Sequence, residues 1–240
     1  MNSKLRSHAD TIVKEAVAAV LPDEAVRRAL RERPLTGKVY LVAAGKAAWQ
    51  MARAAAQCLE GGIAAGVVVT KYGHVMGEIP ACTCFEAGHP VPDENSFAAT
   101  RAALELVEKA GKGDTVLFLL SGGGSALFEL PLIPGEELAD VTRQLLACGA
   151  DIVEMNTVRK RLSAVKGGRF AQACAPAQVF AVVLSDILGD PLDMIASGPA
   201  CPDSSTCEQA LAVAEKYGLK LSAKAMGCLR TETPEALDDG

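Results

Sequence analysis

Short apolar runs alternate with longer segments of helical periodicity along most of the chain. Runs rich in Val and Leu, without regular polar alternation, are typical of strands in a parallel sheet that is covered on both faces. The predicted strands are Val39–Ala44, Gly66–Thr70, Thr115–Leu120 and Val179–Leu184. The predicted helices are Ala47–Leu59, Glu94–Ala110, Glu136–Ala147, Ile152–Leu162 and Thr206–Tyr217. This order predicts an α/β protein of the three-layer α/β/α type, Rossmann-like, with a mostly parallel sheet and helices on both faces.

The first 20 residues carry an apolar stripe at helical spacing. The residues that share this broad face are Leu5, Ile12, Val13, Ala16, Val17 and Val20. An amphipathic helix usually turns such a stripe toward the core. We therefore expect this helix to pack on the body of the protein.

Composition narrows the class of protein. Half of the 240 residues are apolar, and the net charge is −5, without acidic or basic blocks. This apolar share allows a sizeable core, and the lack of clustered positive charge argues against a nucleic acid partner. The first residues do not form a signal peptide, and no apolar run approaches the ~20 residues of a membrane span. We expect a cytoplasmic protein that binds small molecules and no membrane.

The eight cysteines include no CxxC pair, which favours reduced thiols. Cys82, Cys84, His74 and His89 are candidate zinc ligands by residue type alone. Their spacing matches no common zinc site, so we do not expect zinc.

A glycine-rich loop follows the predicted strand Thr115–Leu120. Ser121-Gly-Gly-Gly-Ser125 lies at the carboxyl end of that strand, where an α/β sheet places its ligands. Gly122, Gly123 and Gly124 can turn successive N–H groups toward one point, and the serine hydroxyls add two donors. The loop is a candidate cradle for phosphate or carboxylate. The alternative is a tight turn that needs glycine only to reverse the chain.

Gly45 and Lys46 lie at the turn into the helix Ala47–Leu59. The N-terminus of a helix attracts anions, and a lysine adds a full positive charge. The turn is not a Walker A loop, because Tyr40 replaces the first glycine and no Ser or Thr follows Lys46. Protein-kinase signatures are absent as well. An ordinary surface lysine is the alternative interpretation.

Two further candidates lie near predicted strand ends or loops. Lys71 follows the strand Gly66–Thr70, at the carboxyl end of the sheet, where an α/β fold binds its ligands. His89 precedes a proline in a loop. A functional role, by contact with a carboxylate or by proton transfer, and a structural hydrogen bond within the loop explain it equally well. Asp93 or a neighbour is expected to cap the helix that follows.

Basic and amide side chains recur in the segment 156–168. On a continuous helix, one face would carry Asn156, Arg159, Lys160, Ser163 and Lys166. Such a face beside a Gly-Gly turn suits a polyphosphate, with Arg159 and Lys166 as the favoured binders. The alternative is an ordinary solvated basic face.

Three carboxylates follow the predicted strand Val179–Leu184, namely Asp186, Asp190 and Asp193. They suit Mg²⁺ held with phosphate oxygens, or a general base for a hydroxyl group. Because aspartate also favours turns for local reasons, we expect at least one of the three to do no chemistry.

Six motifs occur in order: AAGKA (43–47), KYGH (71–74), GHPVPDENS (88–96), LSGGGSAL (120–127), NTVRKRLSAVKGG (156–168) and SDILGDPLDMIASGP (185–199). Together they resemble the glycerate 2-kinase family over nearly the whole chain. The resemblance implies ATP-dependent phosphorylation of D-glycerate at its 2-hydroxyl. It also implies an active site in a cleft between an N-terminal α/β domain and a smaller C-terminal domain. We expect Mg²⁺ to accompany ATP.

Roles for individual residues follow from this resemblance and from the local patterns. Lys46 matches the strand-end lysine that the family uses in catalysis, and the catalytic candidates are Lys46, Asp186 and Asp190. The candidates for ATP binding are Ser121, Gly122, Gly123, Gly124, Ser125, Asn156 and Lys166. The candidates for substrate binding are Lys71, His89 and Arg159. The candidates for metal binding are Asp186 and Asp193.

Residues 1–232 would form the N-terminal domain of such an enzyme, and residues 233–240 would begin a linker to a C-terminal domain beyond this sequence. An isolated chain would expose a cleft wall, so we expect a homodimer or weak solubility, and little activity without the second domain.

Two alternatives stay open. A hydroxypyruvate reductase-type oxidoreductase is disfavoured because the turn Ala43–Ala48 lacks the GxGxxG pattern of a nicotinamide site. A catalytically silent domain that binds nucleotides or anions would keep the cradle without turnover.

Overall fold

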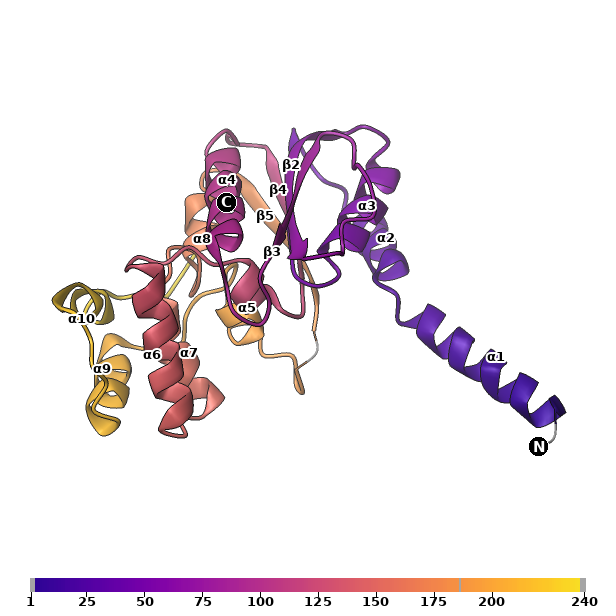
Figure 1. Cartoon of the computed structure of the whole chain (residues 1–240). Coiled ribbons are helices and arrows are strands. Elements are labelled where there is room, and N and C mark those ends of the chain that lie inside the picture. Colours follow the sequence, from indigo (N-terminus) through magenta and orange to yellow (C-terminus); the bar gives the residue numbers. More distant parts are fainter. Residues whose placement is uncertain (1–2, 186, 238–240) are drawn as a thin grey trace.

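The computed structural model describes residues 3–185 and 187–237. Its centre is a five-stranded sheet in the order β3-β2-β1-β4-β5, in which each neighbouring pair of strands is parallel (Figure 1). The strands are β1 (Val39–Ala44), β2 (Ile63–Lys71), β3 (Cys82–Ala87), β4 (Thr115–Ser121) and β5 (Gln178–Leu184). The predicted parallel sheet is confirmed.

The edge strand β3 was not predicted by the sequence pattern. It pairs with β2, and its residues are half-buried or exposed except for Ala87. Its sequence, CTCFEA, mixes polar and apolar residues because an edge strand is only partly covered. It therefore lacks the continuous apolar run by which the other four strands were predicted.

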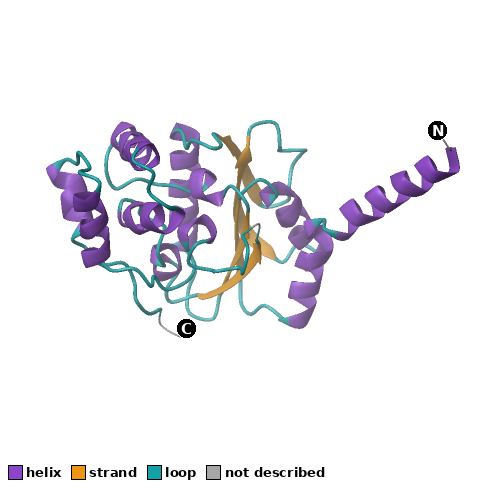
Figure 2. Cartoon of the chain, turned by 90° about the horizontal axis from the view of Figure 1, so that it is seen from below, coloured by secondary structure: helices purple, strands orange, loops and turns teal. Residues whose placement is uncertain are grey.

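Helices cover both faces of this sheet, as Figure 2 shows. The helices are α1 (Ser3–Ala19), α2 (Pro22–Glu32), α3 (Ala48–Leu59), α4 (Glu94–Val107), α5 (Gly124–Leu127), α6 (Gly135–Ala147), α7 (Ile152–Arg161), α8 (Arg169–Ala173), α9 (Cys207–Lys216), α10 (Ala223–Leu229) and the 3₁₀ turn η1 (Ile195–Ser197). One core, around Phe118 and Phe170, joins the sheet to α4, α5 and α8. The other, around Leu41 and Trp49, joins it to α2 and α3. The three-layer α/β/α prediction is confirmed.

A third apolar core lies outside these layers. Helices α6, α7, α9 and α10 pack around side chains such as Val141, Val158 and Leu229. Figure 1 shows this group of helices to one side of the sheet. Because α7 also contacts η1, the group is joined to the loops at the carboxyl end of the sheet.

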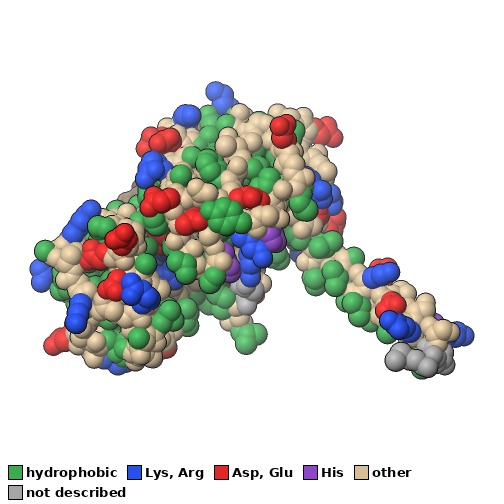
Figure 3. All heavy atoms as spheres, in the orientation of Figure 1, with side chains coloured by type: hydrophobic (Ala, Val, Ile, Leu, Met, Phe, Trp, Pro, Cys, Tyr) green, Lys and Arg blue, Asp and Glu red, His purple; other side chains and the backbone are tan. Residues whose placement is uncertain are grey.

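Helix α1 does not pack on the body, so the expectation that its apolar stripe faces the core is wrong. None of its residues is buried. The side chains of Leu5, Ile12, Val13, Val17 and Val20 are 55–73% exposed. Figure 1 shows the helix projecting from the body, and Figure 3 shows apolar side chains uncovered along it. Periodicity identifies a helix with an apolar face, but it does not identify what that face contacts.

Several helices begin at side chains that bond the first free N–H groups. Asp93 accepts a hydrogen bond from the Ser96 N–H at 3.0 Å, and the Ser96 hydroxyl accepts one from the Asp93 N–H at 3.2 Å. This capping box begins α4 and confirms the predicted cap. Asp151 and Thr206 begin α7 and α9 in the same way.

Within residues 3–185 and 187–237, no helix combines the length and the apolar character needed to cross a membrane. The eight cysteines are free thiols. Burial raises the pKa of Cys82 to about 11, so this thiol stays protonated at neutral pH.

Candidate functional site

The order of the strands reverses between β1 and β4. In an open parallel sheet, such a reversal leaves a crevice at the carboxyl ends of the two strands. Ala44, the last residue of β1, is paired with Leu120 near the end of β4. The Gly45–Lys46 turn and the glycine-rich loop 121–125 therefore leave the sheet side by side.

Hydrogen bonds from the backbone N–H groups of Lys46 and Ala47 hold these two loops together. The Lys46 N–H donates to the Gly122 carbonyl at 2.9 Å, and the Ala47 N–H donates to the Ser121 hydroxyl oxygen at 3.0 Å. Gly45 has a φ of +122°, and a Cβ there would lie 2.5 Å from the Ser121 carbonyl oxygen. The close approach of the loops thus requires glycine at this position. Ser121 itself is buried.

His89 reaches the same place from the loop after β3. A Cβ on Gly123 would lie 3.0 Å from His89 Nε2 and 3.2 Å from Lys46 Cγ, so the three residues meet. The pKa of His89 is lowered by burial first, and then by the positive charges of Lys46 and Lys71. Its imidazole is therefore mostly neutral at pH 7. Candidates from three separate loops therefore lie together, and the charge of Lys71 is close enough to act on His89.

The glycine-rich loop also lines a cavity of about 120 Å³. All five residues of the loop contribute, together with α7 and the segment before and within η1. The lining residues outside the loop are Ile152, Asn156, Arg159, Ile187, Met194, Ile195 and Ala196. This volume is well below the roughly 300–1,000 Å³ typical of a whole-ligand pocket. The cavity matches one small group of a ligand, such as a phosphate or a carboxylate.

Arg159 supplies the positive charge of the cavity. Its Nη2 donates to the Ser125 carbonyl at 3.3 Å. Its Nε is buried and has no hydrogen-bond partner among the described residues. A buried unpaired donor costs about 1–3 kcal/mol, so such a group is best explained by a ligand or water that pairs with it. Arg159 is therefore suited to bind an anion.

Asn156 is 4% exposed and accepts a hydrogen bond from the Ser197 hydroxyl at 2.9 Å. Ser197 belongs to a turn in which Ala196, Ser197 and Gly198 have φ values of +51°, +64° and +63°. Left-handed non-glycine residues cost about 1–3 kcal/mol each and cluster at functional sites. Sequence reasoning did not single out Ala196 or Ser197, although the Gly198-Pro pair signals a turn.

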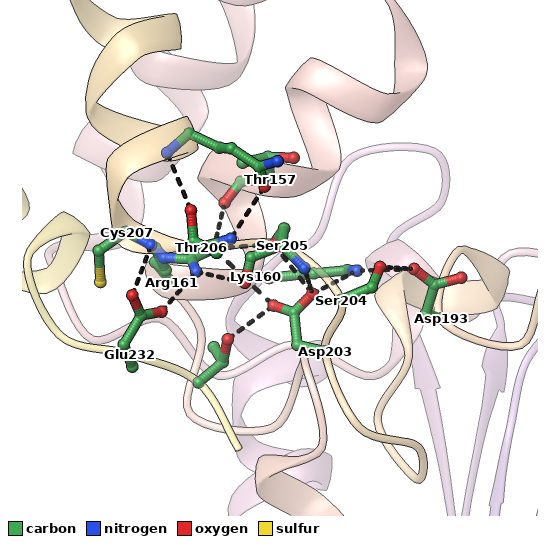
Figure 4. Close-up of polar contacts among 12 residues, drawn as sticks. Thr157, Lys160, Arg161, Asp193, Asp203, Ser204, Ser205, Thr206, Cys207 and Glu232 are labelled. Carbon is green, nitrogen blue, oxygen red and sulfur yellow. Dashed lines mark hydrogen bonds and ion pairs between the residues drawn. The ribbon is translucent and has the colours of Figure 1, made fainter. Parts of the chain in front are cut away.

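Neither Lys160 nor its neighbour Arg161 is solvated, so the alternative of a solvated basic face is wrong for Lys160. They are 2% and 0% exposed. Lys160 Nζ lies 2.9 Å from Asp203 Oδ1 and 3.4 Å from Asp193 Oδ2, and Arg161 Nη2 lies 2.9 Å from Glu232 Oε2. Figure 4 shows both cations directed at these carboxylates. The positive charges of Lys160 and Arg161 are therefore paired with carboxylates inside the protein.

The predicted helical face is also wrong at its end. Helix α7 ends at Arg161, so Ser163 and Lys166 lie in the following segment. Lys166 is fully buried, and its ammonium donates to the carbonyls of Ser125 at 3.0 Å and Phe128 at 3.1 Å. It does not line the cavity. Direct binding of ATP by Lys166 does not fit this position.

The aspartates after β5 do not form a metal site in the described part of the chain. Asp186 lies outside the described residues. Asp190 is exposed, and Asp193 contacts Lys160 and the Ser204 hydroxyl. Over residues 3–185 and 187–237, no group of three His, Cys, Asp or Glu side chains could hold a metal ion. Because the Asp193 carboxylate is already paired with a cation, the described residues do not fit Mg²⁺ by themselves, and we derive no step through it.

A larger groove, of about 360 Å³, lies between α7 and α9. Its lining contains no Lys, Arg or His, and its charged member is Glu154. Lys216 and Tyr217 already bond this carboxylate, and they lower its pKa to about 2. This groove offers no positive charge to an anion, so the smaller cavity is the better candidate site.

The fold and the cavity define a Rossmann-like α/β protein with a glycine-rich loop at the switch point of its sheet. The chain belongs to the family described as a domain of unknown function, DUF4147, which matches residues 8–230.

Similar proteins are named either as glycerate kinases or as putative hydroxypyruvate reductases. A D-glycerate 2-kinase from Thermotoga maritima is 56% identical over 237 residues, which are 98% of this chain and 57% of that protein. A putative hydroxypyruvate reductase from Agrobacterium vitis is 42% identical over 231 residues, or 94% of this chain and 52% of that protein. The crystal structure of glycerate kinase from Thermotoga maritima has a TM-score of 0.94 and 56% identity, covering 99% of this chain and 57% of that one. The chain thus spans about half the length of the curated relatives it matches.

Proposed function

We propose that this chain belongs to an ATP-dependent kinase that phosphorylates D-glycerate to 2-phosphoglycerate. The likeness to a D-glycerate 2-kinase at 56% identity supports this reaction. The observation that carries the proposal is the meeting of Lys46, His89 and Gly123 beside a cavity that contains Arg159.

Phosphoryl transfer depends mainly on positioning and on neutralising charge on the transferring oxygens. The N–H groups of Gly122–Gly124 and the ammonium of Lys46 would stabilise the transferring phosphoryl group. Arg159 and Asn156 would hold a phosphate or the glycerate carboxylate in the cavity. Lys71 and the neutral imidazole of His89 would bind the rest of the substrate.

The remaining assignments stay predictions of this proposal. Asp190 is the candidate to accept the proton of the glycerate hydroxyl. Mg²⁺ would accompany ATP and supply positive charge to its phosphates. Of its two predicted ligands, Asp193 is already paired with Lys160, and Asp186 lies outside the described residues. Residues 1–232 would be the N-terminal domain, with 233–240 leading to a second domain.

We also infer the partners, the cellular location and the self-association of this protein. The net charge of −5 without basic blocks supports small-molecule partners rather than nucleic acid or anionic membranes. A cytoplasmic location fits an ATP-dependent reaction. The uncovered stripe of α1 supports self-association, for which a homodimer is the simplest form.

The proposal is tested by following phosphorus NMR signals after the chain is mixed with Mg-ATP and D-glycerate. A second protein, in which the chain is fused to the part of the Thermotoga maritima relative that it does not span, is assayed in parallel. We expect 2-phosphoglycerate from at least the fusion. Lys46→Ala should lower its kcat by about 10²–10³-fold, because a group that stabilises the transition state is lost.

Lys112→Ala is the matched control, because Lys112 is an exposed lysine in the turn before β4, at the opposite edge of the sheet. It should leave turnover unchanged. A folded fusion that forms no phosphoglycerate would contradict the kinase proposal. If it instead oxidised NADH in the presence of hydroxypyruvate, the reductase alternative would replace it, and ATP binding without turnover would favour the silent domain.

A further inference from the structure

Lys166 is a fully buried lysine whose ammonium is surrounded by oxygens from two walls of the cavity. Nζ lies 3.0 Å from the Ser125 carbonyl oxygen and 3.1 Å from that of Phe128. On the other side, it lies 3.5 Å from the Ala196 carbonyl oxygen, in the left-handed turn. The carboxylate of Glu129, which is also fully buried, lies 3.5 Å away.

Lys166 supplies a donor to each of these carbonyls, and Arg159 Nη2 supplies a second one to that of Ser125. Helix α5 has only four residues, and the last carbonyls of any helix have no partner within it. The Ala196 carbonyl belongs to η1, and the two elements touch, since a Cβ on Gly124 would lie 2.9 Å from the Ala196 Cβ. An ammonium group has three donors and no acceptor, which matches three carbonyl oxygens.

We propose that Lys166 is a positioning residue for the glycine-rich loop, which it holds against the 194–198 turn through the carbonyls of Ser125, Phe128 and Ala196. The loop and the turn form two walls of the cavity. Lys166 thus fixes the width of the cavity without touching a ligand. We call these contacts of Lys166 the clamp. The clamp does not depend on the function proposed above, whereas a role of the cavity in phosphoryl transfer does.

The clamp depends on the proton of Lys166. Burial, the largest effect, lowers the pKa of this ammonium to about 8; the carboxylate of Glu129 opposes this, and the positive charge of Arg159 adds to it. These are the charged groups that act on Lys166: Glu129 lies two residues after the end of α5, and Arg159 lies in α7. When the proton leaves, one of the three donors is lost and a lone pair faces carbonyl oxygens. The loop and the turn should then separate.

Amide hydrogen exchange of the folded chain between pH 6 and 10, corrected for intrinsic exchange rates, tests this proposal. We expect peptides covering 122–128 and 194–199 to lose protection with a midpoint near pH 8. A peptide within β2 should show no such midpoint. Glu129→Gln should shift the midpoint to lower pH, because the carboxylate that stabilises the ammonium is removed.

The double variant Lys166→Met with Glu129→Gln removes both charges at once and so avoids an unpaired buried carboxylate. It should show no midpoint, and its loop peptides should exchange at least about tenfold faster than wild type at pH 7. Wild-type loop protection without a midpoint, or a folded double variant with wild-type protection, would overturn the proposal. If the double variant does not fold, the midpoint pH of Glu129→Gln is compared with that of wild type. An equal midpoint would then overturn the proposal, and a lower one would support it. A chain without kinase activity leaves this test unaffected.

Discussion

At the scale of single residues, the site depends on how closely two loops approach at the switch point of the sheet. Gly45 makes this approach achievable, because its missing side chain leaves room for the Ser121 carbonyl. Lys46 and Gly122 are then joined through their backbones. The position of the catalytic candidate Lys46 is thus a consequence of the glycine that precedes it.

Gly45→Ala should lower the free energy of unfolding by about 2–5 kcal/mol, from backbone strain at positive φ and from overpacking against Ser121. Gly61→Ala is the matched control, because Gly61 has a φ of +88° with nothing within 4 Å of an added Cβ. It should cost only about 1–2 kcal/mol. Urea denaturation measures both, and equal losses would show that the contact with Ser121 is unimportant.

Many of the site residues could be predicted from the sequence. Lys46, His89 and the glycines of the loop were recognisable because each lies beside a strand end or a turn signal, and parallel strands end at one edge. Arg159 was recognisable because basic and amide side chains recur at helical spacing around it. Lys166 was placed wrongly, because the helix it was assigned to ends before it.

At the scale of elements, helix α7 serves two purposes. Asn156 and Arg159 line the cavity, while Lys160 and Arg161 bind carboxylates that come from distant segments (Figure 4). The sequence could not predict this division. The partners of Lys160 and Arg161 lie 43 and 71 residues further along the chain, and helical periodicity carries no information on them.

Asp203 is the centre of this buried network. Burial would raise its pKa, but hydrogen bonds from Thr233 and Lys160 outweigh burial and lower it overall. A depressed carboxyl pKa contributes stability that is present above the unfolded pKa and is lost as the pH falls through the folded one. This contribution should therefore decline below about pH 5.

Asp203→Asn should lower the free energy of unfolding at pH 7 by about 3–5 kcal/mol, because Lys160 and Arg161 lose a buried partner. The variant should also lose less stability than wild type between pH 5 and pH 3. Asp140→Asn, in an exposed pair with Arg143, should change stability by less than about 0.5 kcal/mol. Denaturant titrations across this pH range measure the difference; parallel curves for wild type and Asp203→Asn would contradict the account.

At the scale of the whole molecule, the layered fold followed from the order of apolar runs, but two features did not. The edge strand β3 lacks a long apolar run because only part of it is covered. Helix α1 has the apolar stripe of a packed helix and projects from the body instead (Figure 1). Both depend on which surfaces meet, and sequence pattern gives only which surfaces are apolar.

The central claim is that the glycine-rich loop and Lys46, beside the switch-point cavity, bind phosphate groups of a nucleotide, and an amide NMR titration of the chain with Mg-ATP tests it most directly. We predict that the largest shifts occur at Lys46 and Gly122–Gly124, with the Nε–H signal of Arg159 moving as well. Shifts concentrated in the groove between α7 and α9, or no shifts at millimolar Mg-ATP, would contradict the claim.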